Sequence, residues 1–93
     1  MSVAVMVEIP GVTAAQYEAV IKEVFPGGHP PPGLQFHIAG PTDVGWRVVD
    51  MWDRKESFDR FAQFTLGPAM DRAGITERPI IETWPVHNAA HTH

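Results

Sequence analysis

Residues 45–61 read GWRVVDMWDRKESFDRF, and this stretch decides the fold of the chain. Its first part, from Trp46 to Trp52, is rich in aromatic and β-branched residues, a composition that favours a β-strand. Asp53 follows, and Glu56 stands three residues later, which is the spacing of a capping box at the start of a helix. Two phenylalanines then recur at helical spacing. The stretch therefore predicts a strand that leads directly into a capped helix.

Upstream of this stretch, the sequence predicts another strand and another helix. Residues 3–9 carry a β-branched side chain at every second position, which is the pattern of a strand with one buried face. Thr13 and Gln16 form a second capping-box pair, and apolar residues at helical spacing follow them. Residues 26–33, PGGHPPPG, are expected to end this helix and form a loop, because proline lacks a backbone donor and glycine lacks conformational restraint.

The next segment is predicted to pair with the central strand. Residues 34–39 alternate in polarity, and the turn residues that follow them connect this strand to residues 46–52 as a hairpin. Strict alternation places three apolar side chains on one face of the strand: Leu34, Phe36 and Ile38. His37 is then expected on the opposite face.

Downstream, the predicted helix is expected to break at Gly67-Pro68, and residues 69–73 to add one more turn. Residues 79–87 predict a last strand. The resulting order β-α-β-β-α-β is that of a ferredoxin-like α+β fold, a four-stranded antiparallel sheet with both helices on one face. Residues 1–87 are interpreted as a single domain, and residues 88–93 as a flexible tail.

Composition excludes several classes of protein. The 93 residues carry 7 basic and 11 acidic side chains, a formal net charge of −4, with no basic cluster that would bind a nucleic acid. The chain has no cysteine, which excludes disulfides and thiolate metal sites. No apolar run approaches the ~20 residues that span a bilayer, and no signal-peptide pattern is present. A soluble cytoplasmic protein is therefore expected.

Both faces of the predicted sheet carry apolar side chains. In residues 3–9 the β-branched set occupies one face, but Ala4 and Met6 occupy the other, and the later strands show the same double pattern. Two helices cover only one face, and nothing else in the chain remains to cover the second. A homodimer with two sheets packed face to face is therefore expected, with any ligand site in the interior that the two copies enclose.

The sequence resembles the antibiotic-biosynthesis-monooxygenase-like group of the dimeric α+β barrel superfamily. The resemblance covers residues 3–87, and it is carried most specifically by residues 45–61, with the segment LGPAM at 66–70 and the pair Phe36-His37 similar to small actinobacterial members. It implies a cavity that holds a polycyclic phenol or anthrone, whose carbanion, once formed by a base, reacts with oxygen without a cofactor. It also implies alternatives, because the superfamily includes isomerases, cyclases and haem-binding proteins.

His37 and Asp50 are the candidate catalytic residues. A histidine in the middle of a strand that faces an enclosed pocket is suited to general acid or base catalysis. Asp50 lies on the neighbouring strand of the hairpin, where its carboxylate is expected to orient the imidazole. The alternative for each residue is an ordinary structural hydrogen bond.

The candidate ligand-binding residues are aromatic side chains and their strand neighbours. Flat apolar rings suit the wall of a pocket for an aromatic ligand. The set comprises Trp46, Trp52 and Trp84, with Val48 on the same strand face as the first two and His87 at the end of the last strand. His91 and His93 have only a weak metal-ligand spacing, and no metal site is expected.

The sequence thus predicts a small dimeric enzyme that is cofactor-free and acts as a monooxygenase or isomerase on an apolar aromatic or polyketide-like molecule. Two alternatives stay open. One is a haem-binding barrel with His37 or His87 as axial ligand, and the other is a module that binds or assembles without catalysis. Nucleotide cofactors are not expected, because no glycine-rich phosphate-binding motif is present.

Overall fold

The computed structural model describes residues 1–90. It contains, in order, β1 (Val3–Pro10), α1 (Ala14–Val24), a 3₁₀ turn (Pro26–Gly28), β2 (Leu34–Pro41), β3 (Gly45–Trp52), α2 (Lys55–Phe61), a π-helical segment (Ala62–Leu66), α3 (Gly67–Arg72) and β4 (Ile80–Pro85). Part of the predicted flexible tail, including His91 and His93, lies outside the described residues. None of the helices among residues 1–90 could span a lipid bilayer.

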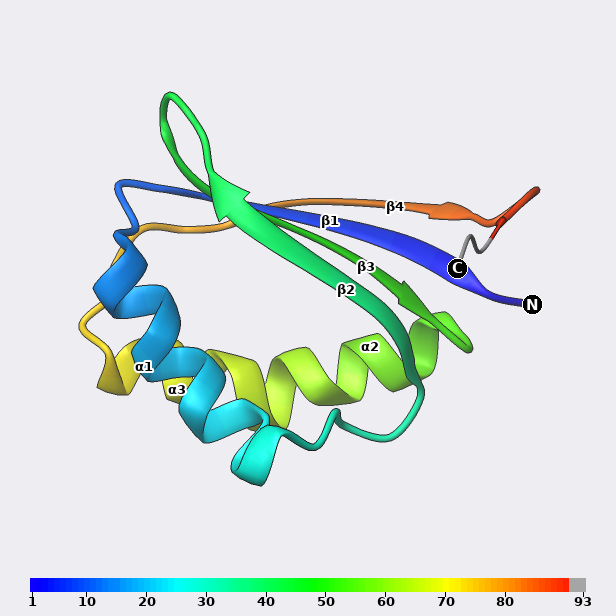
Figure 1. Cartoon of the computed structure of the whole chain (residues 1–93), viewed down its shortest axis with the longest axis horizontal. Coiled ribbons are helices and arrows are strands. Elements are labelled where there is room, and N and C mark those ends of the chain that lie inside the picture. Colours follow the sequence, from blue (N-terminus) through cyan, green and yellow to red (C-terminus); the bar gives the residue numbers. More distant parts are fainter. Residues whose placement is uncertain (91–93) are drawn as a thin grey trace.

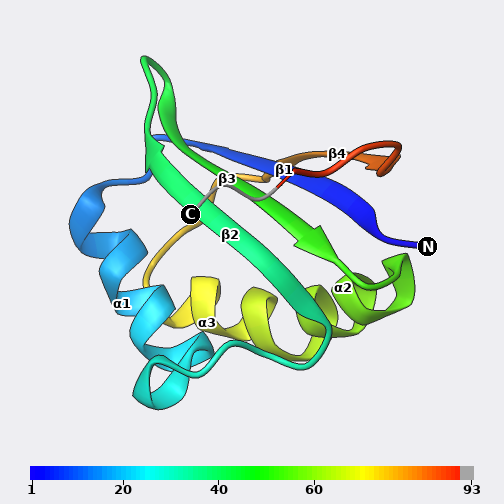
Figure 2. The ribbon, with the colours of Figure 1, turned by 45° about the vertical axis from the view of Figure 1, so that its right-hand side comes forward.

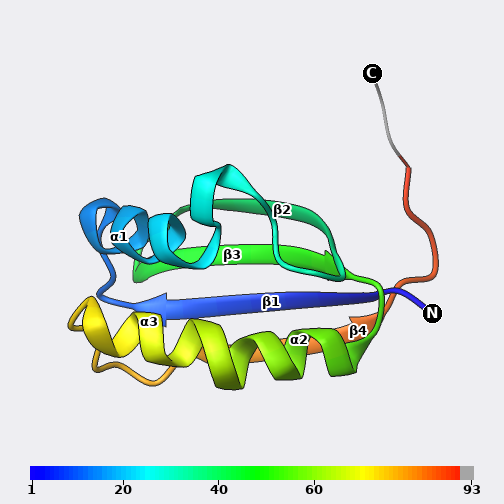
Figure 3. The same ribbon diagram turned by 90° about the horizontal axis from the view of Figure 1, so that it is seen from below.

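The four strands form one antiparallel sheet in the order β2-β3-β1-β4. All helices lie on one face of this sheet, α1 against the β2–β3 side and the α2–α3 run against the β1–β4 side (Figures 1 and 3). The turn of the β2–β3 hairpin projects beyond the sheet, away from the helices (Figure 2). The predicted ferredoxin-like fold is therefore confirmed.

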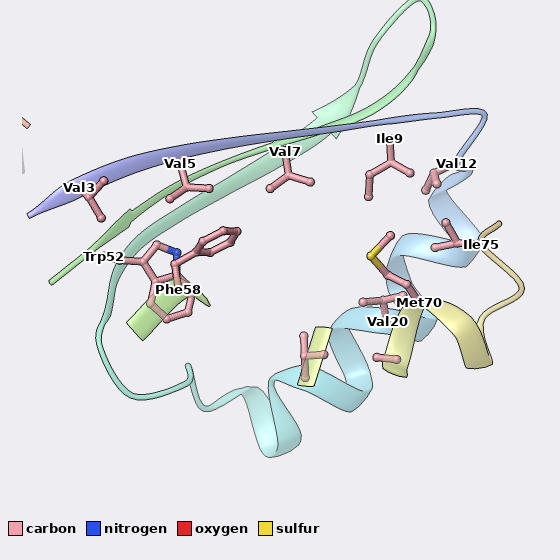
Figure 4. Packing of buried hydrophobic residues seen from close by; sticks show 12 residues of the cluster. Val3, Val5, Val7, Ile9, Val12, Val20, Trp52, Phe58, Met70 and Ile75 are labelled. Atoms are coloured by element: carbon pink, nitrogen blue, oxygen red, sulfur yellow. The ribbon is translucent and has the colours of Figure 1, made fainter. Parts of the chain in front are cut away.

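The core lies between the helices and the inner face of the sheet, the face that the helices cover. The alternating β-branched residues of β1 are all buried on this face: Val3, Val5, Val7 and Ile9. Figure 4 shows them pointing toward Trp52 and Phe58 at one end of the core and toward Met70 and Ile75 at the other. Burial of each such side chain contributes about 1.5–3 kcal/mol, so the period-two pattern of β1 fixes which face meets the helices.

The start of α1 is capped as the sequence predicts. The Thr13 hydroxyl accepts a hydrogen bond from the backbone N–H of Gln16 at 3.2 Å, and the Gln16 side chain accepts one from the Thr13 N–H at 3.1 Å. This reciprocal pair satisfies two backbone donors that have no partner within the helix. It fixes the direction in which α1 leaves β1.

The predicted cap at Asp53 is wrong. Helix α2 begins at Lys55, its cap residue is Arg54, and no side chain makes a cap hydrogen bond there. Asp53 instead donates its backbone N–H to the carbonyl of Gly33 at 2.8 Å. Gly33 has φ +91°, and a Cβ at this position would lie 2.7 Å from the Asp53 carboxylate. The loop before β2 thus passes so close to the start of α2 that only glycine fits.

The predicted break at Gly67-Pro68 is also wrong, because the helix continues from Lys55 to Arg72 through the π-helical segment. At the end of this segment the Gly67 N–H donates to the carbonyl of Ala62, five residues earlier. Proline has no N–H, and its ring clashes with the carbonyl four residues before it in a regular α-helix. The wider π-turn immediately before Pro68 therefore lets the chain continue in helical form.

A β-bulge in β2 decides which side chains face the helices. Leu34 pairs with Trp52 and His37 pairs with Asp50, while the register shifts between Leu34 and Phe36. The extra residue places Leu34 and His37 on the same inner face, and it turns Phe36 to the outer face. The prediction that Leu34 shares a face with Phe36 and Ile38 is therefore wrong, because strict alternation takes no account of a bulge.

The outer face of the sheet, opposite to the helices, is largely apolar. Four large apolar side chains on it are about half exposed: Phe36 (45%), Ile38 (53%), Ile80 (53%) and Trp84 (47%). Val49, Met6 and Met51 lie between them on the two central strands. These side chains form one cluster, unlike the single exposed apolar residues that any protein carries.

One ion pair interrupts this apolar outer face. The Glu8 side chain is buried, and it accepts hydrogen bonds from the Thr42 hydroxyl at 2.7 Å and from the Arg47 guanidinium, with Nε at 3.0 Å. The Thr42 hydrogen bond, followed by those from Arg47, holds the pKa of Glu8 below its usual range. The ionised carboxylate is therefore the form that the folded chain stabilises.

Glu8→Gln is expected to lower the free energy of unfolding at neutral pH and to have no effect in strong acid. Because folding lowers the pKa of Glu8, its stabilising contribution is present above the ordinary glutamate pKa and is lost as the pH falls through the lowered value. Urea unfolding of both proteins from neutral to acid pH measures this difference. Glu77→Gln, at an exposed position between α3 and β4 and outside the sheet, is the control. A difference that persists in acid would contradict the assignment.

Candidate active site

A pocket of about 50 Å³ lies between the inner face of the sheet and the helices of a single chain. Its lining is apolar or aromatic except for Tyr17, His37 and Asp50 and the indole nitrogens of two tryptophans. The expected location of the site, in an interior enclosed by two copies, is therefore wrong for this pocket. The bulge in β2 explains the difference, because it turns His37 toward the helices of its own chain.

His37 and Asp50 lie together as the hairpin register predicts. His37 Nδ1 is 2.6 Å from Asp50 Oδ1, and the two residues are directly paired across β2 and β3. Since a carboxylate only accepts hydrogen bonds, the Nδ1–H donates to Asp50, and in the neutral imidazole the other ring nitrogen, Nε2, is then an acceptor. Asp50 is buried, and its second oxygen accepts a hydrogen bond from Trp52 Nε1 at 3.3 Å. The imidazole is thus held in one tautomer and one orientation.

Tyr17 completes this chain of hydrogen bonds. Its hydroxyl, from α1, donates to His37 Nε2 at 2.7 Å, so that Tyr17, His37 and Asp50 form a continuous Tyr–His–Asp relay. Burial, and then the negative charges of Glu18 and Asp50, raises the pKa of Tyr17. The phenol therefore keeps its proton and serves as the donor that Nε2 requires.

Sequence reasoning missed the role of Tyr17. It lies in the apolar stripe of α1, where a tyrosine is hard to distinguish from any other core aromatic residue. The hydroxyl itself could have indicated this role, because a buried tyrosine hydroxyl usually has a hydrogen-bond partner. Tyr17 is the one tyrosine in the chain. The helix packs against the hairpin that carries His37, so the partner lay within reach.

Trp46, Val48 and Trp52 lie in the pocket wall, as predicted for a ligand site. Trp52 is fully buried and contacts Phe58 and Phe61 in the core. Trp46 stacks on Tyr17 with 5.0 Å between ring centroids and an interplanar angle of 28°. Whether these residues bind a ligand stays a prediction.

The structure does not bring Trp84 and His87 to this pocket, so their predicted place in its wall is wrong. Trp84 pairs with Ala4 and lies on the outer face, because the inner-facing residues of β4 are Ile81 and Thr83. His87 is exposed beyond the end of β4. The sequence pattern misled here because β4 is an edge strand with apolar residues on both faces.

A metal ion needs several ligating side chains in one place, and a haem iron needs a histidine nitrogen that is free to bind it. Within residues 1–90, no three His, Asp or Glu side chains are placed to hold a metal ion. Both ring nitrogens of His37 are already hydrogen-bonded, to Tyr17 and Asp50, so neither is available to ligate an iron. The residues around His37 therefore do not fit an axial haem ligand.

No known family matches the chain by sequence, and no curated protein is detectably similar to it. Solved structures share its fold at low sequence identity. SnoaB, a cofactor-independent oxygenase from Streptomyces nogalater, is 15% identical over 95% of this chain and 94% of its own, with a TM-score of 0.64. Rv0793 from Mycobacterium tuberculosis is 12% identical over 98% and 100%, with a TM-score of 0.68.

A third structure, the monooxygenase from the gene ActVA-Orf6 of Streptomyces coelicolor in complex with nanaomycin D, is 19% identical over 99% of this chain and 92% of its own, with a TM-score of 0.55. The resemblance seen in the sequence is therefore confirmed at the level of fold, which is that of the antibiotic-biosynthesis-monooxygenase-like proteins. At these identities the likeness shows the fold alone.

Proposed function

We propose that the protein is a cofactor-independent enzyme of the monooxygenase or isomerase type, acting on an apolar aromatic or polyketide-like molecule. The observation that carries this proposal is the Tyr–His–Asp relay at the wall of an apolar pocket. A relay of buried, mutually oriented polar groups is costly to maintain in an apolar environment unless it is fully hydrogen-bonded. Here every link is made, and all three residues of the relay line the pocket.

The relay moves a proton from the substrate to His37. The Tyr17 oxygen accepts a proton from an acidic C–H or O–H of the substrate as its own proton passes to His37 Nε2. The imidazolium that results is paired with the Asp50 carboxylate at 2.6 Å, which stabilises the positive charge. Because burial disfavours the phenolate, Tyr17 acts as a shuttle and His37 as the base. Positioned acid–base groups of this kind accelerate reactions by about 10²–10⁴-fold.

The fate of the substrate anion separates the two reaction types. In an isomerase, His37 returns the proton through Tyr17 to a different carbon. In an oxygenase, the carbanion adds dioxygen, the peroxide anion takes the proton back, and the hydroperoxide loses water, so that R₂CH₂ and O₂ give R₂C=O and H₂O. The substrate supplies all the electrons, so this reaction needs no cofactor. The description of SnoaB as a cofactor-independent oxygenase supports this second course.

A ligand of several rings requires the pocket to widen. Its volume of about 50 Å³ is well below the ~300–1,000 Å³ typical of pockets for such ligands. Phe25 and Leu34 line the pocket, and they stand on either side of the Pro- and Gly-rich loop 26–33. We place the opening at this loop, because its displacement moves both side chains at once.

We further propose that two chains pair through the outer face of the sheet. Its large apolar residues are half exposed, and no other segment among residues 1–90 covers them. A second copy offers a self-complementary surface of the same composition, which a two-fold dimer requires. Each copy then carries its own pocket on the opposite side of its sheet.

Anthrone, which has an acidic CH₂ group next to aromatic rings, tests the proposed activity. Without oxygen, the protein is expected to accelerate deuterium exchange at this CH₂ above the buffer rate, as followed by NMR. With oxygen, consumption of one O₂ per anthraquinone formed supports the oxygenase, and exchange without oxygen consumption supports the isomerase. Bound anthrone that neither exchanges nor oxidises would overturn the enzymatic proposal in favour of a binding module.

A further inference from the structure

The indole N–H of Trp46 has no hydrogen-bond partner among the described residues, although the nitrogen is buried. Buried polar groups in folded proteins are nearly always paired, so each exception calls for an explanation. Trp52 provides the contrast within the same pocket, because its indole N–H donates to Asp50 at 3.3 Å. The two tryptophans therefore differ in hydrogen bonding. The N–H of Trp52 is bonded within the protein, and the N–H of Trp46 is free to bond to a ligand.

The position of Trp46 places this donor beside the relay. Trp46 lies near the start of β3 on the inner face, opposite Ile9 of β1, and lines the pocket. Its ring stacks on Tyr17, whose hydroxyl bonds to His37. An unused donor and the group that takes up a proton thus stand side by side in the same apolar wall.

We propose that Trp46 Nε1–H donates a hydrogen bond to a carbonyl oxygen of the bound aromatic substrate. This inference rests on the proposed function, and it narrows the substrate to aromatic compounds whose carbonyl is conjugated with the acidic position. When Tyr17 and His37 remove the proton, the negative charge moves onto this oxygen as an enolate. A donor aimed at an oxygen whose charge grows stabilises the transition state more than the ground state.

Trp46→Phe keeps an aromatic ring and removes only the N–H, so it isolates the proposed bond. Xanthone and xanthene are matched flat probes with and without a carbonyl, and calorimetry measures their binding. Wild type is expected to bind xanthone more tightly than xanthene. The variant is expected to lose about tenfold in affinity for xanthone and nothing for xanthene. Its unfolding midpoint is expected to stay unchanged or to rise, because a buried unpaired donor has been removed.

Trp52→Phe is the matched control. It removes a donor that the protein itself uses, so it is expected to lower the unfolding midpoint. The proposal is overturned if Trp46→Phe destabilises the fold in the same way, which would mean that the N–H is satisfied within the protein or by a fixed water. It is also overturned if xanthone and xanthene lose affinity equally, or if wild type binds neither.

This experiment is independent of turnover, because xanthone has no acidic CH₂ and binds without proton transfer. If Trp46→Phe loses affinity for xanthone alone while wild type leaves anthrone unchanged, the role of Trp46 is supported and the relay is contradicted. Two results together would contradict the role of Trp46 and leave the relay supported. The first is that Trp46→Phe turns over anthrone at the wild-type rate, and the second is that it binds the carbonyl-free analogue of anthrone as tightly as anthrone itself.

Discussion

Asp50→Asn is expected to slow deuterium exchange into anthrone by about 10²–10⁴-fold, the full contribution of a positioned acid–base group. Asparagine has the shape of aspartate, and its amide oxygen still accepts from Trp52 Nε1, so the packing around it is retained. It carries no charge, however, and its NH₂ group cannot accept the Nδ1–H of His37. The imidazolium formed by proton uptake then loses its counterion in an apolar site, where an unpaired charge is most costly.

Asp59→Asn is the control for this prediction. Asp59 is exposed on α2, where it forms an ion pair with Lys55 at 3.0 Å. The same chemical change there is expected to leave exchange unaffected. Near-UV circular dichroism and xanthone binding of Asp50→Asn separate lost catalysis from lost structure, because neither depends on proton transfer. An exchange rate within a few fold of wild type would show that Asp50 is a structural residue.

The exchange rate of a double variant shows whether Tyr17, His37 and Asp50 act as one relay or contribute to the rate separately. Residues that act as one unit give non-additive losses when they are replaced together. Tyr17→Phe removes the hydroxyl that joins the substrate to His37. We expect the combined variant Tyr17→Phe with Asp50→Asn to be no slower than the worse of the two single variants. Additive losses would mean that Tyr17 and Asp50 act independently.

The contact between His37 and Asp50 was predictable from the sequence, while the direction of His37 was not. The contact depends on a hairpin register, which the turn residues between the two strands restrict to a narrow range. The direction depends on the bulge between Leu34 and Phe36, a tertiary feature with no glycine or proline at that point to signal it. A one-residue shift moves every following side chain to the other face, so the predicted location of the pocket changed with it.

Tyr17 and Trp84 show a second limit of sequence reasoning. Apolar periodicity identifies the face that is buried but says nothing about where a polar atom on that face finds its partner. Tyr17 therefore read as core, although its hydroxyl belongs to the relay. Trp84 was predicted to line the pocket, because the sequence of an edge strand with apolar residues on both faces does not show which face meets the helices. The capping pair at Thr13 was predictable, since all its partners are local.

Phe36→Glu is expected to convert the protein from a dimer to a monomer of 10.3 kDa in sedimentation equilibrium. Phe36 lies on the outer face, in one row across the sheet with Met51, Ala4 and Trp84. A two-fold interface would bury two such glutamates among apolar side chains, at several kcal/mol each, which weakens association by about 10³-fold or more. The half-exposed position of Phe36 lets the single chain tolerate the charge.

Phe64→Glu is the matched control, because it makes the same change at an exposed phenylalanine of the π-helical segment, away from the outer face. Wild type and this control are expected at twice the chain mass, and a monomeric wild type would contradict the proposed dimer. Since every wall of the pocket comes from one chain, monomeric Phe36→Glu is expected to keep the wild-type exchange rate. If exchange disappears together with the dimer, a second copy is needed to complete the site, and the single-chain pocket is the wrong assignment.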